Sequence, residues 1–119
     1  MRRPSVGIRV SALVIVALLV AGLAGSALAA RASTPVKVAM SEFKFVLSTK
    51  TMSHGAVVFT VTNKGKLPHD FKIAGKKTAL IGPGKSGKLT VTLKAGKYPY
   101  QCTVAGHAAA GMKGVLSVK

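Results

Sequence analysis

The last third of the chain contains a stretch that alternates like a strand and then changes character: Tyr98-Pro-Tyr-Gln-Cys102-Thr-Val-Ala-Gly-His107-Ala-Ala-Ala-Gly-Met112. Successive side chains of a β-strand point to opposite faces, so Tyr98, Tyr100 and Cys102 share one face. After Cys102 the alternation ends, and Gly106 and Gly111 permit the backbone angles of a tight loop. The stretch therefore predicts a β-strand followed by a loop.

The segments on both sides of this stretch repeat the strand pattern. Short runs with a period of two, separated by turn residues, predict strands. They lie at residues 36–40, 43–47, 56–62, 69–73, 89–93 and 115–118. The sequence has no amphipathic helical pattern of normal length and no internal repeat. These runs predict an all-β domain, either an antiparallel sandwich or a barrel.

One segment between two predicted strands resembles a phosphate-binding loop, Gly82-Pro-Gly-Lys-Ser-Gly-Lys88. The next residue is Leu89, where such a loop needs Ser or Thr to hold magnesium. A phosphate loop also opens a helix, whereas residues 89–93 alternate like a strand. We therefore interpret residues 82–88 as a turn.

The first thirty residues have the three parts of a secretory signal peptide. A basic start with Arg2, Arg3 and Arg9 precedes an apolar run, and small residues follow in an A-x-A pattern at Ala27 and Ala29. We predict a signal peptide at residues 1–30, a short linker at 31–35 and one domain at 36–119. The domain is then exported, to the periplasm or the extracellular space.

The alternative interpretation of the apolar run is an uncleaved anchor. Residues 10–30 carry no charge, and about 20 apolar residues can span a bilayer. The small-residue exit favours cleavage. In both cases the domain itself lies outside the cytoplasm.

The chain after the predicted signal peptide is strongly basic. Without Arg2, Arg3 and Arg9, and with Arg31 counted, 15 Lys and Arg residues face only Glu42 and Asp70, which leaves a net charge of +13. Such a field favours acidic partners or an anionic membrane surface and depends on salt. Export and the even spread of the lysines, which form no basic arm or helical stripe, argue against nucleic acid as the partner.

The chain has a single cysteine, which excludes an internal disulfide. A lone thiol in an oxidising compartment is a liability unless it pairs with another chain or binds a metal. The spacing C-x4-H-x4-M places a thiolate, an imidazole and a thioether in one loop, at Cys102, His107 and Met112. These ligands select copper, and a further histidine would complete a blue-copper electron-transfer site. The residues leave two candidates for it, His54 and His69.

The chain from about residue 36 to 119 resembles the cupredoxins, the group of plastocyanin, azurin and rusticyanin. Three stretches carry the resemblance: Asn63-Lys-Gly-Lys-Leu-Pro-His69-Asp-Phe71, Tyr98-Pro-Tyr-Gln-Cys102, and the loop to Met112 with Lys113-Gly-Val115. The loop spacing is similar to that of rusticyanin and many bacterial cupredoxins. The resemblance implies a Greek-key β-sandwich that binds one type 1 copper ion.

Position by position, the resemblance implies four copper ligands: His69, Cys102, His107 and Met112. It also implies three residues around them. The carbonyl of Pro68 would face the metal, and Asp70 would hydrogen-bond Thr103. The family more often has Asn or Ser at the position of Asp70. His54 is then a surface histidine, and Met40 and Met52 are core or turn residues.

The resemblance implies a monomeric carrier of single electrons between redox partner proteins. The edge of His107 would reach the surface through an apolar patch of Val104 and the neighbouring alanines, while Tyr98 and Tyr100 would pack beneath the site. We expect that the protein is not an enzyme. Copper enzymes of this fold need more histidines, and four protein ligands leave no open position on the metal for a substrate. The alternatives are a copper carrier or buffer and a sandwich that binds no metal.

Overall fold

The computed structural model describes Gly7 and residues 32–119. Apart from Gly7, residues 1–31 lie outside the described residues. They include the predicted signal peptide, for which a membrane anchor is the alternative. Residues 32–119 contain strands and no helix, so no described helix could span a bilayer. β1 (Thr34–Ser41) includes Thr34 and Pro35, which we had assigned to a linker.

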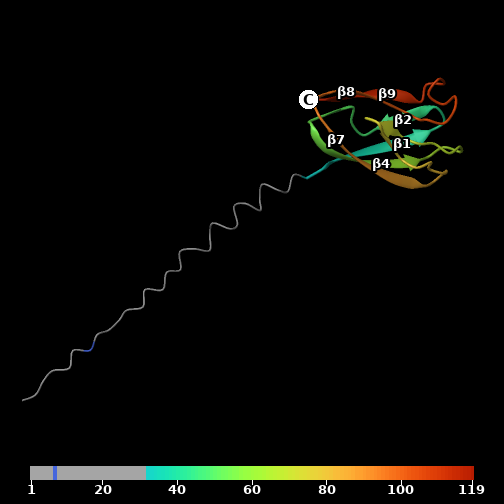
Figure 1. Cartoon of the computed structure of the whole chain (residues 1–119). Helices are drawn as coiled ribbons and strands as arrows, with labels where there is room; N and C mark the ends of the chain where they lie inside the picture. The colour runs from blue at the N-terminus through green and yellow to red at the C-terminus, as the bar shows by residue number, and fades with distance from the viewer. Residues whose placement is uncertain (1–6, 8–31) are drawn as a thin grey trace, which may run out of the picture. The chain divides into compact units, whose positions relative to one another are not determined.

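The predicted β-sandwich is confirmed, with two sheets that form the two layers seen in Figure 1. The first sheet has the order β2-β1-β4-β7. Besides β1, it contains β2 (Lys44–Leu47), β4 (Gly55–Asn63) and β7 (Ser86–Leu93). Residues 82–85 precede β7, so the turn predicted there is present and its last residues join the strand.

The second sheet has the order β3-β9-β8-β5-β6. Its long strands are β8 (Gly96–Gln101) and β9 (Lys113–Val118), and its short ones are β3 (Thr51–Met52), β5 (Lys72–Ile73) and β6 (Lys76–Lys77). The strand predicted at residues 69–73 is therefore shorter, because only its last two residues pair as β5. His69 instead forms an isolated bridge with Ile81.

Each sheet contains one parallel pair, which our expectation of an antiparallel sandwich did not include. β1 runs parallel to β4, with Val36 opposite Phe59, and β3 runs parallel to β9. The other pairs are antiparallel. A parallel pair needs a crossover connection, and here the chain crosses to the other sheet through β3 before it returns as β4.

The core lies between the sheets and follows from the alternation in the sequence. Val36, Val38 and Met40 of β1 are buried, and Met52 is also buried, as predicted for the two methionines. Phe71 lies between Phe59 and Tyr100, with ring centroids 5.1 and 5.6 Å away. This aromatic cluster fills the sandwich beneath the loops that follow β4 and β8.

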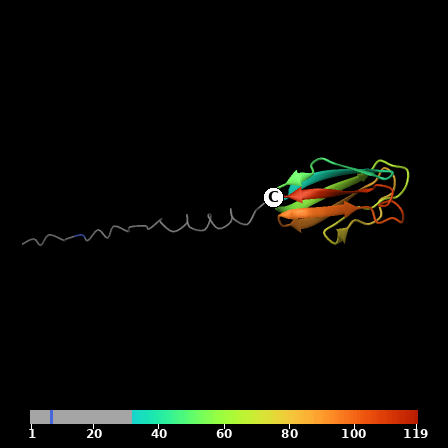
Figure 2. The same ribbon diagram turned by 90° about the horizontal axis from the view of Figure 1, so that it is seen from above.

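Those loops meet at one end of the sandwich. The loop after β8 leaves at the end opposite the C-terminus in both views (Figures 1 and 2). The β1–β2 turn and the segment after β4 reach the same end, since β1 and β4 are parallel. Phe43, which we had placed in a strand, lies instead in this turn with a positive φ of 60°. The turn contacts the candidate site.

Candidate metal centre

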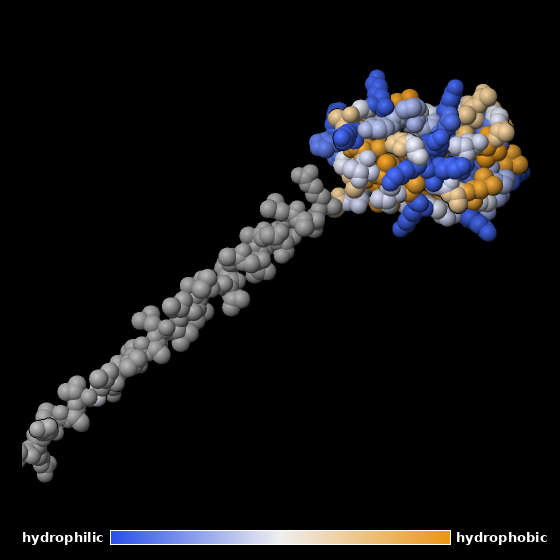
Figure 3. Space-filling view, viewed as in Figure 1, coloured by the Kyte–Doolittle hydropathy of each residue, from blue (hydrophilic) through white to orange (hydrophobic). Residues whose placement is uncertain are grey.

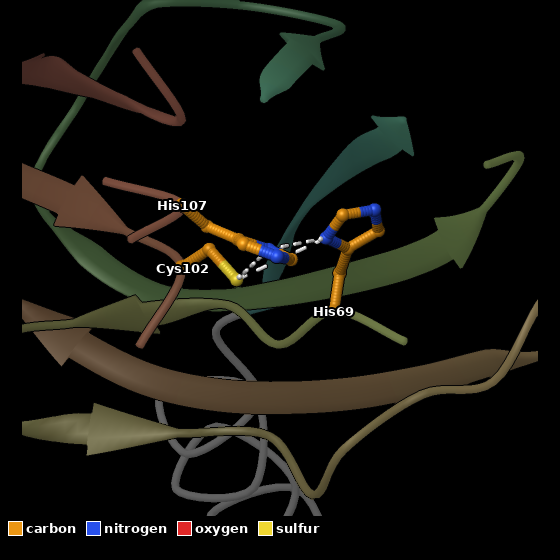
Figure 4. A group of neighbouring side chains, drawn as sticks. All are labelled: His69, Cys102 and His107. Atoms are coloured by element: carbon orange, nitrogen blue, oxygen red, sulfur yellow. Dashed lines mark hydrogen bonds between the residues drawn. The ribbon is translucent and has the colours of Figure 1, made fainter. Parts of the chain in front are cut away.

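Three side chains from two loops converge on one buried point. His69, Cys102 and His107 each offer a ligand atom within 4.8 Å of the others. The Nδ1 atoms of His69 and His107 are 3.1 Å apart. The Cys102 Sγ lies 3.6 Å from the His107 Nδ1 and 4.0 Å from the His69 Nδ1 (Figure 4). Zinc, a comparable ion, binds imidazole and thiolate at about 2.0–2.3 Å. Atoms spaced in this way can share one ion.

The loop between β8 and β9 is closed by its own backbone. Cys102 N donates to Met112 O at 3.1 Å, and Met112 N donates to His107 O at 3.0 Å. The side chain of Met112 is fully buried. A loop tied in this way holds its three candidate ligands in place without help from the metal.

His69 is placed by a second loop, between β4 and β5. Its backbone exchanges two hydrogen bonds with Ile81, 3.1 and 2.8 Å long. The buried Asn63 at the end of β4 donates to Leu67 O and Ile81 O, both at 2.8 Å. The exposed Pro68 directly precedes His69, and the role of its carbonyl stays a prediction.

The structure separates the two histidine candidates. His54 is exposed, as predicted, and its Nδ1 contacts Lys119 O at 2.9 Å, near the C-terminus. Only His69 joins Cys102 and His107 among the described residues. The strand order explains this, because the chain reaches the loop end of the sandwich at the end of β4, whereas His54 precedes β4 at the other end.

The predicted contact between Asp70 and Thr103 is present. The Asp70 carboxylate accepts hydrogen bonds from Thr103 N at 2.6 Å and from the Thr103 hydroxyl. Asp70 follows His69 and Thr103 follows Cys102, so this contact joins the two loops beside their candidate ligands.

The sequence model described as copper-binding proteins of the plastocyanin/azurin family matches residues 24–119. The chain belongs to this family. An auracyanin crystal structure from the photosynthetic bacterium Roseiflexus castenholzii, reduced with dithionite, is similar with a TM-score of 0.63 and 23% identity, over 75% of this chain and 99% of that one. Auracyanin B has a TM-score of 0.66 and 21% identity, over 76% and 91%. No curated protein sequence matches significantly.

Membership in the plastocyanin/azurin family makes copper the cofactor of this protein and electron transfer its general role. The converging donors fit that metal, since a soft thiolate and two imidazoles select copper. Burial raises the pKa of the Cys102 thiol, while backbone N–H groups of Asp70 and Val104 lower it. The metal-free thiol therefore keeps its proton, and a bound metal must displace it.

Glu42 is a residue of the site that we did not identify from the sequence. Its Oε1 lies 3.3 Å from the His69 Nε2, the ring nitrogen that faces away from Cys102 and His107. Oε1 also accepts hydrogen bonds from Leu67 N at 2.9 Å and Lys66 N at 2.6 Å. These two N–H groups, with a smaller effect of His69, lower the pKa of Glu42 to about 2. The carboxylate is thus an anion at neutral pH.

His107 connects the centre to the surface. It is 8% exposed. Its Nε2 has no hydrogen-bond partner within residues 32–119. Every fully buried side-chain nitrogen or oxygen in these residues does have a partner. Nε2 is therefore open to solvent. The exposed Phe43 ring packs edge-to-face with the His107 ring, with ring centroids 5.3 Å apart, and this contact adds Phe43 to the apolar patch predicted around His107.

Apolar residues are visible at the loop end of the domain in Figure 3, and others lie among hydrophilic side chains on the rest of that face. Leu67, 45% exposed, lies two residues from His69. Tyr98 and Tyr100 point to the same side of β8 as Cys102, as predicted, and Tyr100 is the more deeply buried of the two.

Proposed function

We propose that the protein is an exported type 1 blue copper protein that shuttles single electrons between redox partners. His69, Cys102, His107 and Met112 are the proposed ligands. The observation that carries the proposal is the convergence of two imidazole nitrogens and one thiol sulfur within 4.8 Å at a buried point. The buried Met112 side chain supplies the fourth donor from the same loop.

Copper supplies the change between two oxidation states when it is bound. The protein's part is to keep the donors fixed, and the backbone hydrogen bonds of Cys102, His107 and Met112 support this role. Burial of the donors keeps water away, which affects the reduction potential. A site with four protein ligands leaves no position for a substrate, which supports an electron carrier rather than an enzyme.

The exposed edge of His107 is the proposed exit for the electron. Phe43, Leu67 and the loop alanines around it carry no charge, and small transient contacts suit electron carriers. This geometry favours a partner that touches the loop end of the sandwich.

The proposed partner is acidic, and a row of cations beside the site supports this. The row crosses four neighbouring strands of the second sheet, β6, β5, β8 and β9. Its members lie opposite one another in the order Lys77, Lys72, Gln101 and Lys113. All four side chains are exposed. Like charges opposite one another on a sheet destabilise it, and no acidic residue in the described chain is free to compensate them, since Glu42 and Asp70 point to the site. An acidic protein surface would relieve this repulsion.

The remaining parts of the proposal concern the compartment. We propose that residues 1–30 direct export and that the domain from the start of β1 onwards, residues 34–119, is the functional, monomeric part. An anionic membrane surface is the alternative site of docking for the lysines.

The visible spectrum of the copper-loaded protein tests the function. We expect an intense band near 600 nm, as thiolate-to-copper charge transfer gives. It should disappear on reduction and be absent in Cys102→Ser. A weak, broad spectrum without this band contradicts the proposal. A blue band combined with fast loss of copper to a mild chelator would favour the alternative, a copper carrier or buffer.

A further inference from the structure

The whole chain contains only two acidic residues, Glu42 and Asp70, against 18 Lys and Arg. Both carboxylates are used at the candidate centre: that of Asp70 on Thr103 and that of Glu42 on His69. Asp70 contacts the residue that follows a proposed ligand, whereas Glu42 contacts a ring nitrogen of a proposed ligand itself.

The carboxylate of Glu42 is held in place by the protein. Glu42 lies in the turn between β1 and β2, where Ser41 pairs with Lys44. Its Oε1 is fixed by the N–H groups of Lys66 and Leu67, in the loop that also carries His69. The Glu42 side chain is 34% exposed and that of His69 is fully buried, so the carboxylate closes the solvent side of the imidazole.

Gly65 provides the space for this carboxylate. A Cβ at that position would clash with the Glu42 carboxyl group. Gly65 N donates to the Asn63 side-chain oxygen at 2.8 Å, and this bond turns the loop so that the next two N–H groups point at Glu42. The turn, the glycine and the two donors together aim one oxygen at His69.

We propose that Glu42 is a positioning residue that holds the His69 proton on Nε2, leaves Nδ1 free for copper, and stabilises the oxidised, more positive form of the centre. This inference rests on the proposed function. A hydrogen bond at one ring nitrogen determines which tautomer the other presents. An anionic acceptor at that nitrogen also raises the basicity of a metal-binding imidazole. The carboxylate therefore lowers the reduction potential.

Glu42→Gln tests the charge, because a Gln oxygen can still accept the same three hydrogen bonds. We expect the blue band to remain and the reduction potential to rise. Gln101→Lys is the matched control, since it adds the same unit of positive charge at an exposed site next to Cys102 without touching His69. Its shift should be smaller and should vanish at high salt, because exposed charges are screened.

Glu42→Ala tests the position, with a readout that needs no copper. In the metal-free protein, ¹⁵N NMR of the His69 ring should show the proton on Nε2 in wild type and in Glu42→Gln. In Glu42→Ala, and in Gly65→Ala where the carboxylate must move, we expect a mixture of tautomers. The Ala variants should also lose copper faster.

The outcomes separate the two proposals. If wild type gives no blue band, the proposed function fails, while the tautomer experiment still tests the contact of Glu42 with His69. If wild type is blue but Glu42→Gln shifts the potential no more than Gln101→Lys, or shifts it downward, the inference on Glu42 is overturned. An unchanged His69 tautomer in Glu42→Ala also overturns it.

Discussion

The carboxylate of Asp70 accepts two hydrogen bonds from Thr103, one from its backbone N–H and one from its hydroxyl. The two residues are 33 positions apart and belong to different loops. Asp70 is 5% exposed. Because each follows a proposed ligand, the contact fixes the distance between the two loops whether or not metal is bound.

Asp70→Ala should therefore destabilise the metal-free protein. It removes both hydrogen bonds to a buried carboxylate, and hydrogen bonds to charged groups contribute about 1.5–3 kcal/mol each. We expect the free energy of unfolding in urea to fall by at least that amount. Thr103→Ala is the control, because it removes only the hydroxyl bond and should cost less. Equal losses in the two variants would show that the backbone bond contributes nothing.

A second relationship joins Tyr100 and Gly114, which lie opposite each other on β8 and β9. A Cβ at Gly114 would clash with the hydroxyl end of the Tyr100 ring. That ring cannot move freely, since Phe45 and Phe71 both lie 5.6 Å from it. Overpacking of this kind costs about 1–3 kcal/mol, and we expect Gly114→Ala to lose this much stability.

Gly82→Ala is the matched control for Gly114→Ala. Its Cβ would meet only the Lys85 side chain at 3.8 Å, an ordinary contact. Thermal unfolding of the two variants should show a clear decrease in Tm for Gly114→Ala and little change for Gly82→Ala. A smaller side chain at position 100 should relieve the clash. The double variant Tyr100→Leu/Gly114→Ala should therefore lose less stability than the sum of the losses in the two single variants.

The strands could be predicted because burial on one face repeats every second residue. Val36, Val38 and Met40 show this pattern in the sequence and are buried in the structure. The two-residue strands β3 and β6 could not be found in this way, since two residues carry no period. The parallel pairing of β1 with β4 depends on how the chain crosses between sheets, which alternation does not record.

The candidate site was predictable where residue types and spacing carry the chemistry. The C-x4-H-x4-M loop and its resemblance to cupredoxins pointed to residues that the structure brings together. Glu42 was missed because its contact with His69 spans 27 positions and depends on a turn. One signal was available: with two acids in a basic chain, each is a candidate for a specific role.

The burial of Tyr100 predicts a dependence of stability on pH. Burial raises the pKa of its hydroxyl above the usual value of 10.0. Above pH 10 the unfolded state then loses this proton more readily than the folded state, so stability decreases as pH rises. Below pH 10 both states are protonated and the contribution does not change.

Tyr100→Phe removes this ionisation and keeps the ring. The difference in the free energy of unfolding between wild type and Tyr100→Phe should be constant from pH 8 to about 9.5 and should then shift in favour of the variant. Urea unfolding of the metal-free proteins measures it, and all other groups are the same in both proteins. A difference that stays constant up to pH 11 would contradict the effect of burial.

The lysine row of Lys77, Lys72 and Lys113 predicts how the protein meets an anionic partner. Hexacyanoferrate(III) is a suitable probe, since it accepts one electron and carries three negative charges. Reversal of all three lysines to Glu should slow oxidation of the reduced protein by roughly tenfold at low salt, as electrostatic steering is lost. The reversal should also weaken the salt dependence of the rate, because fewer attractive charges remain to be screened.

The control reverses Lys37, Lys88 and Lys94, which are exposed on or just after strands of the other sheet. It changes the net charge by the same amount, so a rate governed by total charge alone would fall equally in both variants. A larger fall for the row on the second sheet would place the approach of the anion beside Gln101 and Cys102, on the strand that leads to the site. Equal rates in the two variants would mean that the row has no special role and that the high charge acts only as a diffuse field.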